Sequence, residues 1–401
     1  MPFDPAVLRA SFAVVERRAD QLTKYFYAHL FSHNPGLRAL FPARMDEQRD
    51  RLFSSLTHLV LRMEEPGRLR DYLTALGRDH RKFGAAPAHY PAIGASLIAA
   101  LRHFSGHYWT QEAEKAWTEA YTVISQTMIE AAAGAARDAP DWWQAEVTVR
   151  RRAAPDLVVL TLAPDRPYPF TAGQYLTLSS PRVPKVWRPY SIACAPRPDG
   201  TLELHVRRVP AGLLSTVLVN DVLPGETVRV GPPLGDAVLD PGSTRPVLAV
   251  AGGTGWAQIK SVVEQLALDG GRPTTLHLAA RGGADPYDLA TVRQLARRHR
   301  RLEVVVAPAG HDGDAEPGQA GGPLCTGLLR HRDLSGHDVH LSGPPGLVAR
   351  LAEQLTAQGA RPELIRYDPG PDTFNRVRPV TTSEWFLDRR DPGWINPTEL
   401  A

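Results

Sequence analysis

Residues 69–83 read LRDYLTALGRDHRKF, and this stretch organises the first part of the chain. Its apolar residues recur at the spacing of one buried helical face, at Leu69, Tyr72, Leu73, Leu76 and Phe83. His80 lies on the same stripe, so its imidazole is expected to point inward. An unpaired buried polar group costs about 1–3 kcal/mol, so His80 needs a partner. That partner is either a nearby backbone carbonyl or a bound metal ion.

The segment before this helix carries a second apolar stripe, formed by Met45, Leu52, Leu56, Leu59 and Met63. Gln48 lies on that stripe. Residues 31–42 read FSHNPGLRALFP and predict a helix–turn–helix corner that places Phe41 between the two helices. Tyr27 lies one turn before the corner, and Tyr90 follows a break at residues 84–87. An imidazole, an aromatic ring and hydrogen-bond donors in one helical pocket suit a haem group that binds oxygen.

With these residues, the first third of the chain resembles the globin domain of flavohaemoglobins. The matching residues are Tyr27, Phe41, Gln48, His80 and Tyr90. The resemblance implies a haem b group with His80 as the proximal iron ligand and with Phe41 against the porphyrin. It also implies that Tyr27 and Gln48 are distal hydrogen-bond donors and that Tyr90 supports His80 from the proximal side.

One proximal residue departs from this family. Ala132 stands where flavohaemoglobins place a glutamate beside the proximal histidine. His80 is therefore expected to bond only a backbone carbonyl of its own helix. An acceptor on the imidazole makes the ligand more basic, so its loss predicts a higher Fe(III)/Fe(II) potential.

Composition places the chain among globular proteins of two or three domains, with 401 residues and a hydrophobic fraction of 43%. The net charge of +3 comes from 46 basic and 43 acidic residues that are interspersed, which argues against nucleic acid or a membrane surface as partner. The opening residues mix charges among apolar side chains, unlike a secretory signal, and no uncharged apolar run is long enough to span a membrane. We therefore expect a soluble cytoplasmic protein.

Pattern changes along the chain predict a multidomain protein. Residues 1–137 read as helices throughout and predict an all-α globin domain. Six short β-rich runs then predict a closed antiparallel barrel, at residues 145–151, 156–162, 175–179, 189–193, 201–207 and 227–231. From residue 241 strands alternate with helices, which predicts an α/β domain with a parallel sheet. The expected domains are 1–137, 138–240 and 241–370, followed by a tail, 371–401, that contains four aromatic residues.

The barrel carries candidate flavin contacts. Arg188 suits a pyrophosphate, Tyr190 the edge of an isoalloxazine and Ser191 the flavin N5, although an ordinary β-strand is equally compatible with these residues alone. Gly212 and Ser215 open a short helix, which can hold a phosphate at its N-terminus. Together with Gly173-Gln174-Tyr175, these motifs resemble the ferredoxin-reductase family over residues 143–368, which implies FAD, with Tyr175 among its contacts.

The α/β domain carries candidate nicotinamide contacts. Gly252-Gly253-Thr254-Gly255 lies between a predicted strand and helix, where glycines let the backbone approach a pyrophosphate. A structural tight turn is the alternative, because Gln258 takes the place of the third glycine of the full fingerprint. Ser342-Gly343-Pro344 resembles a family turn that normally begins with cysteine, so hydride transfer is expected to be slower or differently poised. The aromatic ring that the family places near its C-terminus is missing after Tyr367-Asp368, and Phe374 or a tail tryptophan can substitute for it.

Together, the resemblances imply a nitric oxide dioxygenase. Electrons would pass from NAD(P)H through FAD to haem, and nitric oxide and O2 would be converted to nitrate. Two alternatives stay open at this stage. One is a haem-based oxygen or redox sensor or carrier with a flavin module that resets it, and the other is a flavin-dependent reductase of quinones, ferric chelates or dyes. Arg281 can face the 2′-phosphate of NADPH or solvent, so the choice of nucleotide stays open, as does the oligomeric state.

Overall fold

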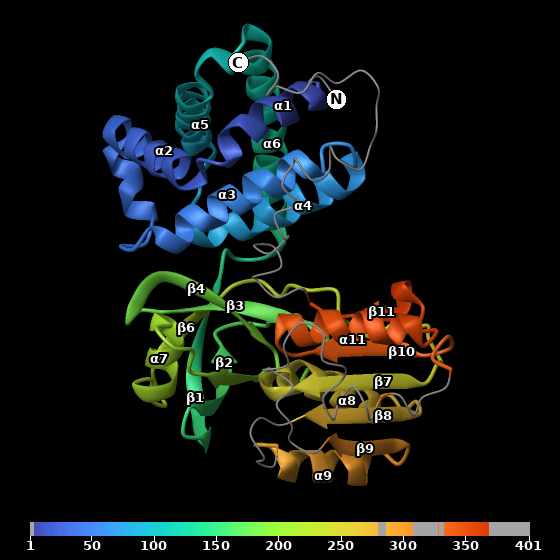
Figure 1. The fold of residues 1–401 in the computed structure, drawn as a ribbon. Helices are drawn as coiled ribbons and strands as arrows, with labels where there is room; N and C mark the ends of the chain where they lie inside the picture. Colours follow the sequence, from blue (N-terminus) through green and yellow to red (C-terminus); the bar gives the residue numbers. More distant parts are fainter. Residues whose placement is uncertain (1–3, 280–285, 308–327, 329–332, 369–401) are drawn as a thin grey trace. The chain divides into compact units, whose positions relative to one another are not determined.

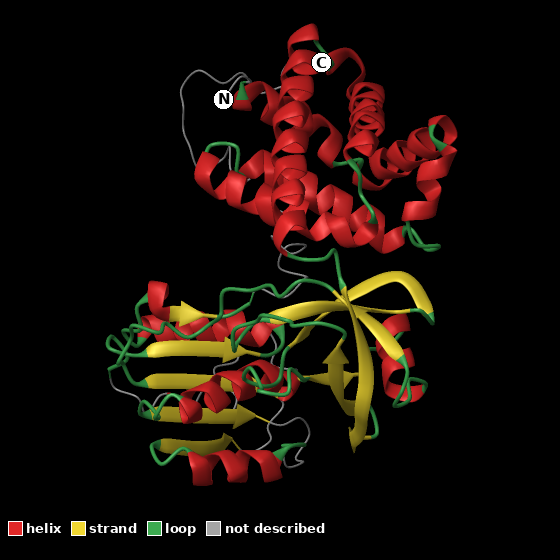
Figure 2. Cartoon of the chain, turned by 180° about the vertical axis from the view of Figure 1, so that it is seen from behind, coloured by secondary structure: helices red, strands yellow, loops and turns green. Residues whose placement is uncertain are grey.

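The computed structural model describes residues 4–279, 286–307, 328 and 333–368 (Figure 1). The described residues form two compact units, 4–139 and 140–368. The first unit is built of helices, and the second combines strands with helices (Figure 2). The predicted fold class, an all-α domain followed by an antiparallel barrel and an α/β parallel sheet, is confirmed.

In the first unit, the described α-helices are α1 (Pro5–Glu16), α2 (Ala19–His33), α3 (Asp46–Leu61), α4 (Pro66–His80), α5 (Tyr90–Ser105) and α6 (Gln111–Asp138). Its main apolar core is formed by residues of α1, α2, α3, α5 and α6. Phe12 stacks on Phe53 with their ring centroids 5.6 Å apart, and Trp117 donates its indole N–H to the Ser11 hydroxyl at 2.9 Å. The second contact joins residues 106 positions apart, which ties the last helix of the unit to the first.

Helix α4 ends earlier than its apolar stripe predicts. The stripe continues to Phe83, but Arg81–Phe83 form a 3₁₀ turn. Gly84 closes this turn with a φ of +74°, a left-handed conformation that glycine adopts without strain. His80 is therefore the last residue of α4, at a corner where the chain changes direction.

Helix α4 packs against α6 at very short range. A Cβ atom added to Gly77 would lie 2.4 Å from the Met128 carbonyl oxygen and 2.7 Å from its Cα. Only glycine fits there, because both obstacles are backbone atoms. Around this contact Leu69, Leu73, Leu59 and Met128 form a buried apolar cluster. The α4–α6 contact thus fixes the helix that presents His80.

The barrel of the second unit is one six-stranded antiparallel sheet in the order β4-β3-β6-β1-β2-β5. A bridge between Ile192 and Leu204 brings its two edges together. The strands are β1 (Trp143–Ala154), β2 (Leu157–Pro164), β3 (Tyr175–Ser180), β4 (Val183–Ser191), β5 (Leu202–Arg207) and β6 (Thr227–Val230). All six predicted runs are strands, and β4 begins six residues earlier than its predicted start at residue 189. Helix α7 (Leu213–Asn220) packs on β4 and β5.

The remaining sheet is parallel, in the order β11-β10-β7-β8-β9 (Figure 1). Its strands are β7 (Val247–Gly252), β8 (Thr274–Ala279), β9 (Leu302–Ala307), β10 (Asp338–Ser342) and β11 (Ile365–Arg366), and its helices are α8 (Trp256–Leu268), α9 (Leu289–Arg298) and α11 (Pro345–Ala357). The chain moves from β7 outward to β8 and β9 and then returns to the other side of β7 with β10. The carboxyl ends of β7 and β10 therefore meet at a topological switch point, where ligands bind in open α/β sheets.

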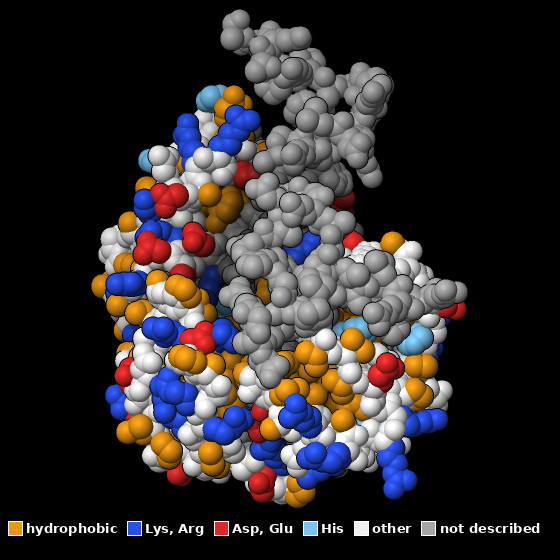
Figure 3. Space-filling model, turned by 60° about the horizontal axis from the view of Figure 1, so that its bottom comes forward, with side chains coloured by type: hydrophobic (Ala, Val, Ile, Leu, Met, Phe, Trp, Pro, Cys, Tyr) orange, Lys and Arg blue, Asp and Glu red, His pale blue; other side chains and the backbone are white. Residues whose placement is uncertain are grey.

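Basic and acidic side chains are interspersed on the described surface seen in Figure 3, as the sequence composition predicts. Within the described ranges, no helix combines the length and the apolar character that crossing a membrane requires.

Candidate functional site

Three of the predicted haem-site residues come together in the first unit. The ring of Tyr27 on α2 packs edge-on against Phe41, with centroids 5.5 Å apart. Its hydroxyl lies 3.5 Å from the backbone carbonyl oxygen of Gln48, at the first turn of α3. Burial raises the pKa of Tyr27 to about 12, so this residue is a neutral hydroxyl donor at any physiological pH. The sequence therefore places a buried phenol, an aromatic ring and an amide-bearing residue in one cluster.

His80 is oriented by its own helix. Its Nδ1 lies 2.8 Å from the Leu76 carbonyl oxygen, one turn earlier on α4. Since a carbonyl only accepts, Nδ1 must carry the proton, and Nε2 keeps its lone pair. Burial lowers the pKa of His80, which favours the neutral ring. This is the tautomer of a histidine that ligates a metal through Nε2, and the carbonyl partner is the one expected from Ala132.

Gln48 and His80 lie at the same end of the α3–α4 pair. At the other end His58 on α3 packs against Tyr72 on α4, with centroids 4.4 Å apart. Gln48 lies roughly 15 Å before this contact along α3, and His80 lies roughly 12 Å after it along α4, at the helical rise of 1.5 Å per residue. The corner after His80 also approaches the corner of Phe41, because a Cβ on Gly84 would lie 3.8 Å from Leu40.

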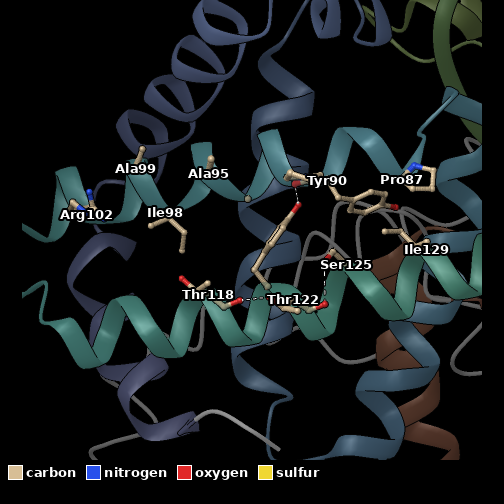
Figure 4. A pocket seen from close by; sticks show the side chains of 13 residues that line it. Pro87, Tyr90, Ala95, Ile98, Ala99, Arg102, Thr118, Thr122, Ser125 and Ile129 are labelled. Atoms are coloured by element: carbon tan, nitrogen blue, oxygen red, sulfur yellow. Dashed lines mark hydrogen bonds between the residues drawn. The ribbon is translucent and has the colours of Figure 1, made fainter.

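The support that Tyr90 is expected to give His80 from the proximal side stays a prediction. No hydrogen bond joins Tyr90 to His80 in the described part of the chain. The Tyr90 ring packs in the cluster of Leu59, Leu69, Leu73 and Met128, and Figure 4 shows it directed toward Pro87. Its backbone carbonyl accepts a 2.7 Å hydrogen bond from the Tyr121 hydroxyl. The Tyr90 backbone thus helps to hold α5 on α6.

A groove of about 580 Å³ lies between α5 and α6 beside Tyr90 (Figure 4). Its floor is tight, because a Cβ on Gly94 would lie 2.4 Å from the Tyr121 ring. Two of its hydroxyls are already engaged: Thr118 and Thr122 each donate to a carbonyl one turn back in α6, at 2.8 Å. Hydroxyls bound within their own helix offer little to a polar substrate, so this groove is not the reactive site.

The predicted flavin residues lie on two paired strands of the barrel. Tyr175 on β3 pairs with Ser191 on β4, and Leu176 pairs with Tyr190. Because side chains alternate along a strand, Arg188 and Tyr190 face one side and Ser191 the other. A flat ligand that touches all four predicted flavin residues must therefore bind at the strand ends. There β3 begins at Tyr175 and β4 ends at Ser191.

The predicted phosphate cradle has its hydroxyl engaged locally. Ser215 in the first turn of α7 accepts the Val209 N–H at 3.1 Å and donates to the Gly212 carbonyl at 3.3 Å. Gly212 has no room for a side chain, because a Cβ there would lie 2.7 Å from the Ser215 hydroxyl. The motif thus builds a tight entry to α7, and phosphate binding at the N-terminus of this helix stays a prediction.

The two predicted nicotinamide motifs pack backbone against backbone at the switch point. A Cβ on Gly255 would lie 2.2 Å from the Ser342 carbonyl oxygen, and one on Gly343 would lie 3.3 Å from the Gly252 backbone. Gly253 differs from these, since it has a φ of +57° and an added Cβ would meet no atom within 4 Å. The glycines therefore have two roles. Gly252, Gly255 and Gly343 allow the two motifs to pack closely, and Gly253 leaves its backbone accessible to a ligand.

In the sequence, Gln258 stands out only as the residue in place of a third glycine, and no motif points to Asp368. In the structure Gln258 is 3% exposed, and its amide donates to the Gly173 carbonyl at 2.8 Å and to the Asp368 carboxyl. Burial raises the pKa of Asp368 to about 7, the nearby charge of Asp236 adds to the rise, and the hydrogen bond from Gln258 opposes it. The useful signal was a polar residue on the buried face of α8, beside Lys260 and Ser261.

Several expectations fall on residues outside the described ranges. These are the position of Arg281, and the packing of the tail with Phe374 and its tryptophans. The choice between NADH and NADPH and the replacement for the missing C-terminal ring therefore stay predictions.

Comparison with known proteins agrees with both units. Residues 24–128 match the globin family, and residues 144–238 match the oxidoreductase FAD-binding domain. A flavohaemoprotein from Bordetella pertussis is 30% identical over 289 residues, covering 67% of this chain and 71% of its own length. A flavohaemoprotein from Chromobacterium violaceum is 28% identical, covering 92% of this chain and 98% of its own.

Among solved structures, a flavohaemoglobin from Malassezia yamatoensis with bound FAD and haem has the same fold. It matches with a TM-score of 0.71 over 91% of this chain and 97% of its own, at 17% sequence identity. The fold therefore agrees over nearly the whole length, and the sequence likeness to the Bordetella protein extends over two thirds of it. The chain belongs to the flavohaemoprotein family.

Proposed function

We propose that this protein is an NAD(P)H-dependent nitric oxide dioxygenase that binds haem b and FAD and takes nitric oxide and O2 as substrates. The observation that carries the proposal is the arrangement around His80. Its Nδ1 is bound by the Leu76 carbonyl, and it lies at the same end of the α3–α4 pair as Gln48, whose backbone contacts Tyr27. Membership of the flavohaemoprotein family supports the pairing of this helical site with a reductase unit.

On the haem side each residue has a distinct role. Haem supplies the redox-active iron that binds oxygen, and its protein ligand would be His80 through Nε2. The Phe41 ring would pack on the porphyrin. Tyr27 donates a hydrogen bond from a hydroxyl that stays protonated, because burial raises its pKa to about 12. That hydroxyl lies 3.5 Å from the Gln48 carbonyl and is also hydrogen-bonded by the Gln48 side chain, so Tyr27 and Gln48 would act together on an oxygen ligand.

On the reductase side the chain binds and orients two nucleotides. Tyr175 and Ser191 would border the flavin, and Arg188 with the N-terminus of α7 would hold its pyrophosphate. The open backbone of Gly253 would receive the NAD(P)H pyrophosphate, beside Ser342 at the end of β10. A hydroxyl at Ser342 can position a nicotinamide but lacks the polarisable sulfur of the family cysteine, so we expect slower hydride transfer than in cysteine-bearing members.

Two variants test the assignment of cofactors to the two sets of residues. His80→Ala should lose the haem Soret band but retain FAD, because its ligand is removed and the flavin residues are untouched. Gly255→Ala places a methyl group 2.2 Å from the Ser342 carbonyl, so it should abolish NADH-driven reduction and leave haem binding intact. If His80→Ala still binds haem through a histidine, the proposed ligand is wrong. If Gly255→Ala is reduced at the normal rate, the proposed nicotinamide turn is wrong.

A further inference from the structure

Gln258 is a buried amide with both of its N–H groups engaged. It lies in the first turn of α8, three residues after the Gly252–Gly255 turn, and is 3% exposed. A buried primary amide has two hydrogens to donate, and each one left unpaired is costly. Here one goes to the Gly173 carbonyl at 2.8 Å and the other to the Asp368 carboxyl. The side-chain amide of Gln258 thus connects α8 to two segments that are distant from it in the sequence, at Gly173 and at Asp368.

Gly173 is held on both of its backbone groups by α8. Its N–H donates to the Ser261 hydroxyl at 2.9 Å, and that hydroxyl donates to the Gln258 backbone carbonyl at 2.8 Å. Gly173 has a φ of +102°, and a Cβ there would lie 2.3 Å from the Ala237 carbonyl oxygen. The backbone of Gly173 is therefore held in one place. Strand β3 begins two residues later, at Tyr175.

Asp368 lies against the same loop cluster. A Cβ on Gly235 would lie 2.6 Å from the Asp368 carboxyl and 3.0 Å from the Tyr175 ring, so carboxyl and ring border one glycine. The carboxyl is faced by Gln258 from α8 and by the exposed Asp236 from the loop after β6, and the Tyr175 ring borders the same glycine. No cation is among these groups, so the carboxylate form depends on Gln258 and on the backbone N–H groups at residues 236 and 237.

We propose that Gln258 is a positioning residue of the reductase unit, which fixes the Gly173 carbonyl and the Asp368 carboxyl beside Tyr175 and sets the proton occupancy of Asp368. This rests on the proposed function only in that Tyr175 borders the flavin. Burial already raises the pKa of Asp368 to about 7, so the group changes charge within the physiological range. Losing the Gln258 donor removes a hydrogen bond to the charged form and should raise that pKa further.

The test compares Gln258→Met, which keeps chain length but has no donor, with Gln265→Met. Gln265 lies on the same helix and bonds Asp269 at the surface, so it is a matched control. The first readout is hydrogen–deuterium exchange of residues 171–176 in flavin-free protein. The second is FAD affinity from flavin fluorescence between pH 5.5 and 8.5. The third is the pH profile of flavin reduction by NADH.

Gln258→Met should speed exchange of residues 171–176 about ten-fold, and should move both pH midpoints upward by about one unit. Gln265→Met should change none of the three. Asp368→Asn should flatten both pH dependences and retain slow exchange. Ser261→Ala should speed exchange without moving the midpoints, and it supplies a second variant if Gln258→Met does not fold.

Normal exchange and unmoved midpoints in Gln258→Met would overturn the inference. Faster exchange with unmoved midpoints would overturn its second half, the control of Asp368 by Gln258. If the wild-type protein binds no FAD, the proposed function fails instead, and the exchange data alone decide whether Gln258 holds Gly173.

Discussion

Gly77→Ala tests how closely the position of His80 depends on the packing of α4 against α6. The added methyl group would lie 2.4 Å from the Met128 carbonyl oxygen, whereas real Cβ contacts are essentially never below 3.0 Å. The helices must therefore move apart by about 0.6 Å (3.0 − 2.4), because backbone atoms cannot turn away. Overpacking of this kind costs about 1–3 kcal/mol. Alanine in place of glycine recovers about 1 kcal/mol of helix propensity, so the net destabilisation at the upper end of that range is about 2 kcal/mol.

The matched control is Gly67→Ala, in the same helix, where an added methyl group meets nothing within 4 Å. It should be neutral or stabilising by up to about 1 kcal/mol, so the two variants should differ in sign. Denaturant unfolding of the full chain followed by far-UV circular dichroism measures the stabilities. Because His80 lies one turn after Gly77, only Gly77→Ala should also release haem faster to an excess of apomyoglobin. Equal stability and equal haem retention in the two variants would refute the argument that this contact fixes the proximal helix.

Three further substitutions probe other parts of the structure. Tyr27→Phe removes a hydrogen-bond donor to oxygen, and stopped-flow measurement should show O2 dissociation faster by about ten-fold or more; an unchanged rate would place Tyr27 outside the oxygen site. Arg272 lies 2.8 Å from the fully buried Asp338 carboxyl, and Asp338→Asn leaves it facing a neutral amide. Denaturant unfolding should show that the free energy of unfolding falls by about 3 kcal/mol, and a fall of less than about 1 kcal/mol would contradict that account. Burial and then Arg366 lower the pKa of His340 from 6.5 to about 4. The contribution of His340 to the free energy of unfolding is therefore fully present above pH 6.5. It is lost by about 1.4 kcal/mol for each pH unit as the pH falls from 6.5 toward 4. His340→Gln should remove that slope from the unfolding free energy, and an unchanged slope would contradict the assignment.

The helical periodicity of the sequence predicts much of the haem side. The stripes that contain Gln48 and His80 belong to α3 and α4, because an apolar face with a period of 3.6 residues has few other ways to be buried. The end of α4 was predicted three residues too late, since the apolar stripe continues through the 3₁₀ turn Arg81–Phe83 that follows the helix. The orientation of Tyr90 could not be predicted, because no local pattern indicates that its ring packs in the cluster of Leu59, Leu69, Leu73 and Met128.

Long-range polar partners were beyond the reach of sequence patterns. Gln258 and Asp368 are 110 positions apart, and neither has a local signature for the other. The strand β11 has two residues, too few to show alternation. By contrast, the glycine turns at Gly252–Gly255 and Ser342–Pro344 were predicted separately and meet in the structure, because β7 and β10 are parallel neighbours whose carboxyl ends lie together.

The most direct test of nitric oxide dioxygenase activity is the amount of nitrate formed for each NAD(P)H oxidised, in air with added nitric oxide. Each nitric oxide that combines with O2 to form nitrate takes up one electron, and NAD(P)H supplies two. We therefore predict two nitrates for each NAD(P)H, and loss of nitrate formation in His80→Ala. NAD(P)H oxidation that yields no nitrate, or that continues at the same rate in His80→Ala, would contradict the proposed function.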